Sequence, residues 1–203
     1  MDVINLISKH QSFLNAEEVV QTCPYQPATQ YYANGPRLHE YLQELKDMVL
    51  SKYDIMTVGE MPFVLDEQKI LKIVQPDGYL NMVFLFEMVE IDILPGHFRL
   101  SIHPWTVEDL KRIVNKWQRL MIDNGGWNSL YCENHDQPRS VSRFCDDSDE
   151  YHEFGSKLLC LLETTLCGTI YIYQGEELGM RNVPTSWSVD EYKDVESNTY
   201  WQS

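Results

Sequence analysis

The chain has 203 residues, of which 43% are hydrophobic and 23% charged, an ordinary globular balance that excludes wholesale disorder. Its 16 basic and 31 acidic residues leave a net charge of −15. This acidity argues against a nucleic-acid binder, because such a protein needs a positive surface for phosphates. No run of residues approaches the roughly 18 consecutive apolar residues of a membrane-spanning helix, so the sequence predicts no membrane partner.

The N-terminal residues and the cysteines both bear on location. Residues 1–9 have no basic head and only a short apolar run, so they do not predict a signal peptide. The cysteines are odd in number and widely spaced, at Cys23, Cys132, Cys145, Cys160 and Cys167. No two of them form a Cys-x-x-Cys pair, and they predict reduced thiols in a cytoplasmic protein.

Segments with helical and strand-like patterns alternate along the chain. The predicted helices are 38–49, 66–74, 107–121 and 151–166. The predicted strands are short apolar runs at 54–60, 80–86, 129–133 and 168–174. Thr106 and Asp109 resemble a capping box at the start of the third helix, and Gly125 follows its end. The alternation predicts an α/β protein with a parallel sheet.

Acidic residues follow several predicted strands, where parallel α/β sheets collect their binding and catalytic groups. They are Glu60, Glu133, Asp136, Glu176 and Glu177. Their spacing alone is compatible with acid–base and nucleophilic catalysis, with a metal site or with solvated loops. A metal site is disfavoured because the histidines lack ligand spacing such as His-Glu-x-x-His.

Four segments carry a family resemblance. They read Met-Asp-Val-Ile-Asn at 1–5, Thr-Val-Gly-Glu-Met-Pro at 57–62, Glu-Asn-His-Asp-Gln-Pro-Arg at 133–139 and Tyr-Ile-Tyr-Gln-Gly-Glu-Glu at 171–177. In this order they resemble the α-glucosidases of the α-amylase superfamily, glycoside hydrolase family 13. The greatest similarity is to the fungal maltase and isomaltase (oligo-1,6-glucosidase) group.

The resemblance implies a retaining glycosidase and a role for each matching residue. Asp2 would be the nucleophile, and Glu60 would be the general acid and then the general base. Asp136 would stabilise the oxocarbenium-like transition state and hold sugar hydroxyls. His135 would bind a sugar hydroxyl.

Two further positions match the family's substrate site. Val3 resembles the residue of the α-1,6-cleaving type, and Arg139 is expected to bind substrate. The implied substrates are short α-linked glucosides such as isomaltose, maltose or sucrose. No cofactor is implied. A structural Ca²⁺ occurs in some relatives but is not expected here, because its usual loops would precede residue 1.

The resemblance also implies an incomplete TIM (β/α)8 barrel, from about the fourth to the eighth strand. Residues 1–186 would be the C-terminal part of the barrel, and 187–203 a polar tail in which the catalytic domain is cut short. Open barrel edges predict self-association or pairing with another chain, and no more than trace catalysis. The alternatives are a non-catalytic interaction protein and a pseudogene-like fragment, either one pairing with a full-length α-glucosidase.

Overall fold

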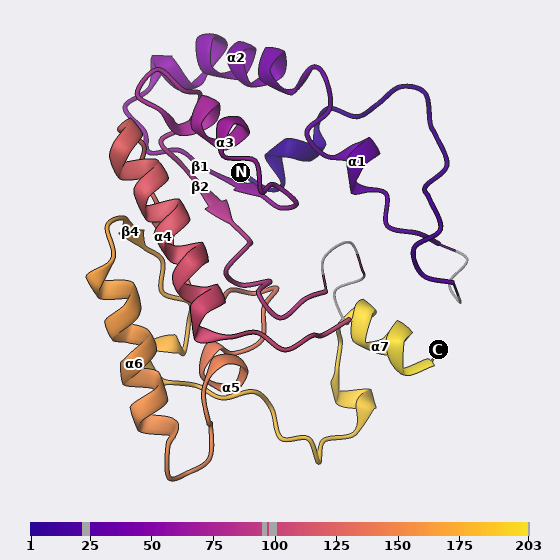
Figure 1. The fold of residues 1–203 in the computed structure, drawn as a ribbon, viewed down its shortest axis with the longest axis vertical. Helices are drawn as coiled ribbons and strands as arrows, with labels where there is room; N and C mark the ends of the chain where they lie inside the picture. Colours follow the sequence, from indigo (N-terminus) through magenta and orange to yellow (C-terminus); the bar gives the residue numbers. More distant parts are fainter. Residues whose placement is uncertain (22–24, 95–96, 98–100, 203) are drawn as a thin grey trace. The chain divides into compact units, whose positions relative to one another are not determined.

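The computed structural model describes residues 1–21, 25–94, 97 and 101–202 (Figure 1). The chain divides into two compact units. The first unit is Met1–Cys132 with Leu161–Tyr171, and the second is Glu133–Cys160 with Ile172–Ser203. The expected division of the chain at residue 186 remains a prediction.

Strands and helices alternate through the first unit, as the sequence predicts. Its elements up to the second strand are η1 (Ile4–Leu6), α1 (Thr29–Tyr32), α2 (Leu38–Met48), η2 (Leu50–Lys52), β1 (Val58–Met61), α3 (Glu67–Val74) and β2 (Met82–Leu85). They are followed by α4 (Val107–Asn124), β3 (Ser129–Leu130) and β4 (Thr169–Ile170). The second unit contains α5 (Ser140–Phe144), η3 (Glu176–Leu178), η4 (Val189–Glu191) and α7 (Val195–Gln202). Helix α6 (His152–Thr165) contributes residues to both units.

Among the described residues, the strands of the first unit form two two-stranded parallel sheets rather than the one parallel sheet that the sequence predicts. β1 pairs with β2 from Val58↔Met82, and β3 pairs with β4 from Ser129↔Thr169. The Ser129 hydroxyl also donates to the carbonyl of Val83 on β2, at 2.5 Å. The parallel α/β pairing is therefore confirmed, and within each sheet the carboxyl ends of the two strands share one edge.

The helices begin and end where local chemistry favours it. The Asp66 side chain accepts from the amides of Gln68 and Lys69 and so caps α3. Thr106 and Asp109 form the predicted capping box of α4, and Gly125, with φ of 69°, ends that helix. The apolar face of α4 is buried through Ile113, Trp117, Leu120 and Met121. Together with Ile70 and Ile73 of α3 and Val83 of β2, these side chains belong to the core of the first unit.

Loss of the α4 cap is expected to destabilise the first unit. Thr106→Ala removes the hydroxyl that accepts from the Asp109 amide at 3.2 Å, at a cost of about 1 kcal/mol of unfolding free energy. Urea denaturation followed by circular dichroism measures this loss. Thr199→Ala is the control, because the Thr199 hydroxyl only donates within its own helix, to the carbonyl of Val195. Equal losses in the two variants would contradict the role of the cap.

The same variant has a pH signature. The Thr106 hydroxyl and amide, which donate to the Asp109 carboxylate, hold the pKa of Asp109 below its usual value. The stabilisation that this gives is present above the unfolded-state pKa and is lost as the pH falls through the lowered folded-state pKa. The difference between wild type and Thr106→Ala is therefore expected to narrow in acid, and a constant difference would exclude this linkage.

The structure differs from the sequence prediction mainly in the lengths of the strands. The run 54–60 was expected to be a strand, but β1 begins at Val58, and Ile55 and Met56 are exposed. The runs 80–86, 129–133 and 168–174 likewise shorten to β2, β3 and β4. An apolar run predicts burial, whereas strand assignment requires a hydrogen-bonded neighbour along its whole length.

The structure also describes most of the predicted tail and four of the five cysteines. The tail 187–203, for which no element was predicted, contains η4 and α7. Cys132, Cys145, Cys160 and Cys167 are thiols outside any disulfide, whereas Cys23 lies outside the described residues. Among the described residues, no helix combines the length and the apolar content needed to cross a bilayer.

Candidate functional site

Asp2 lies next to β1 because the chain terminus pairs with that strand. The Met1 amino group donates to the carbonyl of Val58 at 2.8 Å, and the Glu60 amide donates to the carbonyl of Met1 at 3.0 Å. This is the hydrogen-bond pattern of a parallel bridge between Met1 and Gly59. The next pair in register is Asp2 and Glu60, so this pairing brings the predicted nucleophile and acid–base residue to neighbouring backbone positions. Figure 1 marks the N-terminus beside β1.

The segment after Asp2 is fixed by a buried asparagine that the sequence prediction did not single out. Asn5 is fully buried, and its side-chain amide donates to the carbonyl of Pro62 at 2.7 Å. The Asn34 amide in turn donates to the carbonyl of Asn5 at 2.8 Å. Asn5 therefore ties the strand-like terminus to the residues that follow Glu60.

Two residues near Asp2 and Glu60 have a positive backbone φ, which is typical of the left-handed region. Val3 has φ of 29° and Phe63 has φ of 61°, and branched or bulky residues seldom adopt such values. Backbone strain of this kind costs about 1–3 kcal/mol per residue and persists only where the surroundings enforce it. Here, the Asn5 contacts and the pairing of Met1 with β1 supply part of that enforcement.

The second unit carries the predicted His135 and Asp136 on a tight turn. The Asn134 side chain accepts from the Asp136 amide at 2.8 Å, which is an Asx turn. His135 Nε2 lies 3.5 Å from Asp136 Oδ2, and both side chains are more than half exposed. The two predicted sugar-binding groups are thus held together, facing solvent within this unit.

The turn is closed by an ion pair between a buried carboxylate and a partly exposed guanidinium. Glu133 Oε1 accepts from Arg139 Nη1 at 2.7 Å, and Glu133 Oε2 accepts from the Ser140 amide at 2.6 Å. The Glu133 side chain is 1% exposed and that of Arg139 is 19% exposed. Arg139, which was predicted to bind substrate, has its guanidinium engaged by the protein itself.

Aromatic side chains pack together near the carboxyl ends of the strands in the first unit. The Phe84 ring lies edge-on to Tyr131 and Tyr171, with centroids 5.1 Å and 4.6 Å apart. The Tyr131 hydroxyl donates to the carbonyl of Leu85 at 3.0 Å. Burial raises the pKa of Tyr171, so it stays a neutral donor, directed at the sulfur of Met82 at 3.3 Å. These contacts connect β2 to the ends of β3 and β4.

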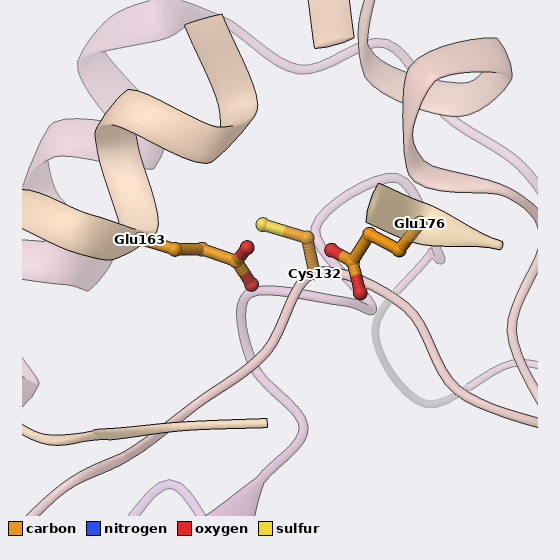
Figure 2. A group of neighbouring side chains, drawn as sticks. All are labelled: Cys132, Glu163 and Glu176. Atoms are coloured by element: carbon orange, nitrogen blue, oxygen red, sulfur yellow. The ribbon is translucent and has the colours of Figure 1, made fainter. Parts of the chain in front are cut away.

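A buried thiol and a buried carboxylate also lie close together in the first unit. Figure 2 shows the Glu163 side chain of α6 pointing toward Cys132, which follows β3, and their potential ligand atoms lie within 4.8 Å. Glu176, drawn in the same view, belongs to the second unit, where its carboxylate accepts from the Tyr173 amide at 2.8 Å. Structural zinc sites use four ligands, so the thiol and carboxylate of the first unit do not by themselves form one.

The predicted site residues thus form two groups. Asp2, Val3 and Glu60 lie in the first unit, and His135, Asp136 and Arg139 lie in the second. Sequence reasoning missed Asn5 and Glu133 as structural supports of the site. The available signal was their position inside the matching segments, beside the residues that were singled out.

The sequence matches a known protein family and several characterised relatives. A family model described as the catalytic domain of α-amylase matches residues 1–201. The chain is 44% identical over 203 residues to an α-glucosidase of Schizosaccharomyces pombe, covering 100% of this chain and 35% of that protein. It is 48% identical over 197 residues to an oligo-1,6-glucosidase of Parageobacillus thermoglucosidasius, covering 97% of this chain and 34% of that protein.

Solved structures of related enzymes also match this chain. The structure of trehalose-6-phosphate hydrolase from Bacillus licheniformis matches with a TM-score of 0.82 at 40% identity, covering 99% of this chain and 34% of that one. A mutant isomaltulose synthase from Erwinia rhapontici NX5, in complex with its natural substrate sucrose, matches with a TM-score of 0.87 at 34% identity, covering 99% and 35%. The expected partial (β/α)8 barrel is confirmed, and the chain spans about a third of the length of these relatives.

Proposed function

Because the chain belongs to the α-amylase catalytic-domain family, we propose that it carries the machinery of a retaining α-glucosidase for short α-1,6- or α-1,4-linked glucosides. Isomaltose, maltose and sucrose are the substrates of this class that we propose. The observation that carries the proposal is the pairing of Met1 with β1, which puts Asp2 level with Glu60. A retaining enzyme needs two carboxyl groups only about 5 Å apart. Neighbouring strands lie about 4.8 Å apart, so side chains at paired positions on one face can come that close.

The two carboxyl groups divide the chemistry. Glu60 protonates the leaving oxygen while Asp2 attacks the anomeric carbon and forms a glucosyl ester. Glu60, now a carboxylate, takes a proton from water, and this water releases glucose with net retention of configuration. Carboxyl groups alone carry this chemistry, so the proposal requires no cofactor.

The remaining residues have supporting roles. Asp136 would hold sugar hydroxyls and stabilise positive charge at the transition state, and His135 would donate to a hydroxyl. Val3 would shape the side of the site that accepts the leaving group. The contacts of Arg139 with Glu133 and Gln174 favour a role in holding the turn rather than direct binding. A cytoplasmic location stays part of the proposal, supported by the thiols.

The chain on its own is proposed to turn over slowly. It spans about a third of its relatives' length, and the rest of their barrel would complete the walls that exclude water and orient the sugar. Within the described residues, β4 has β3 as its only partner strand. This edge supports the second candidate function, an interaction protein that pairs with another chain, and a stable monomer in size-exclusion chromatography would argue against it.

Hydrolysis of isomaltose and of a chromogenic α-glucoside tests the proposal. The purified chain is expected to show trace turnover, and Glu60→Gln is expected to lower it about 10²- to 10⁴-fold, because general acid–base catalysis contributes that much. Glu44→Gln, at an exposed position on α2, is the control and should leave the rate unchanged. Turnover that survives Glu60→Gln would exclude the assigned role. No turnover in any folded variant would mean that the chain alone is not a hydrolase.

A further inference from the structure

The segment 133–140, which carries His135 and Asp136, is closed at its base by one buried carboxylate. Glu133 begins the segment and Ser140 ends it, and the Ser140 amide donates to Glu133 Oε2 at 2.6 Å. The other oxygen, Oε1, accepts from Arg139 Nη1 at 2.7 Å. Glu133 therefore spans the whole turn with two charge-assisted hydrogen bonds, which are shorter and stronger than neutral ones.

Arg139 extends this closure to a second segment of the same unit. Its Nη1 also donates to the carbonyl of Gln174 at 2.7 Å, and its guanidinium lies 5.1 Å from the Tyr173 ring centroid. The Arg139 backbone amide donates to the side chain of Asn182 at 2.8 Å. A guanidinium holds its five N–H donors in a rigid planar fork, whereas the donors of an ammonium group rotate freely.

Stability alone does not account for an ion pair with a buried carboxylate in this place. Two well-packed apolar side chains of similar volume commonly stabilise a protein as much as a buried ion pair or more. What these hydrogen bonds add is directionality, because an N–H donor loses its bond steeply as the N–H···O angle departs from linear. The side chains that need a fixed orientation, His135 and Asp136, are themselves largely exposed and receive little packing.

We infer that Glu133 is a positioning residue, which acts through Arg139 and the Ser140 amide to fix the turn that presents His135 and Asp136. The functional importance of this positioning rests on the proposed function, since His135 and Asp136 are the proposed sugar-binding groups. Its structural content, that the carboxylate of Glu133 sets the shape of this turn, can be tested without any sugar.

Amide NMR of the full chain, wild type and Glu133→Gln, is the test. The variant keeps nearly the same size, but its amide cannot accept from Arg139 and from the Ser140 amide as two charged oxygens do. Hydrogen exchange of the Ser140 amide is expected to speed up roughly 10- to 100-fold, because that factor corresponds to the free energy of a hydrogen bond to a charged group. The amide signals of 134–137 are expected to shift or broaden.

Two further variants separate positioning from general stability. Glu153→Gln is the matched control, since Glu153 pairs with Lys157 at the exposed surface of α6 and should leave the turn unchanged. In Glu133→Gln combined with Arg139→Gln, the two side-chain amides can hydrogen-bond each other. This double variant should recover part of the protection of the Ser140 amide against exchange. Faster exchange spread evenly over the second unit, or an unshifted turn in Glu133→Gln, would overturn the inference.

A titration with D-glucose distinguishes failure of the inference from failure of the proposed function. In the wild type, glucose is expected to shift the amides of His135 and Asp136, and in Glu133→Gln the apparent affinity should fall about tenfold if the turn is lost. No shift in the wild type would count against the proposed sugar site, while the exchange of the Ser140 amide would still decide the role of Glu133.

Discussion

Glu60→Gln is expected to accumulate a glucosyl ester on Asp2 when the chain is given α-glucosyl fluoride. Fluoride leaves without a proton, so the first step does not depend on the acid role of Glu60. The second step still needs Glu60 as the base, and its loss should slow release of glucose about 10²- to 10⁴-fold. The parallel bridge between Met1 and Gly59, which brings Asp2 level with Glu60, is the structural reason to expect the ester at that residue.

Intact-protein mass spectrometry of acid-quenched samples measures the ester, and peptide mapping locates it. The modified peptide should be the segment Met1–Lys9. Asp2→Asn combined with Glu60→Gln is the control and should give no adduct. Wild type that hydrolyses the fluoride while Glu60→Gln collects no ester, or an ester on another carboxylate, would show that the assigned roles are wrong.

The parts of the fold that the sequence predicts well are those with strong local signals. The helix expected over 107–121 is α4, because its apolar spacing, its Thr106 cap and Gly125 all act within a few residues of one another. The helix expected over 66–74 is α3, with Asp66 as its cap. Helices α5 and α7 were not predicted. The first is a single short turn, and the second leaves Val195, Tyr200 and Trp201 exposed rather than on one buried face.

For the candidate site, too, the sequence motifs nominate residues but do not reveal contacts between residues far apart in the chain. Motif order is enough to nominate Asp2 and Glu60, but their adjacency depends on a bridge between residues 1 and 59 that no periodicity reveals. The Asn5 contact with Pro62 joins residues 57 positions apart. Glu133 was visible only as an acidic residue after a strand. Its closure of the turn depends on where the backbone brings Arg139 and Ser140.

Arg139→Ala is expected to lower the free energy of unfolding by about 3–5 kcal/mol, because it leaves the carboxylate of Glu133 buried without its cation. Urea denaturation with circular dichroism measures the loss. Arg181→Ala is the matched control within the second unit, since Arg181 pairs with Asp149, whose side chain is 96% exposed, and should cost no more than about 1 kcal/mol.

An apolar replacement of both partners separates stability from positioning. Glu133→Leu combined with Arg139→Met removes both charges together, and buried pairs replaced in this way often lose nothing in stability. We expect this double variant to recover most of the unfolding free energy lost in Arg139→Ala, yet to leave the Ser140 amide poorly protected, because leucine offers it no acceptor. A double variant that restored both stability and Ser140 protection would show that packing, rather than the directed hydrogen bonds of Glu133, holds the turn that carries His135 and Asp136.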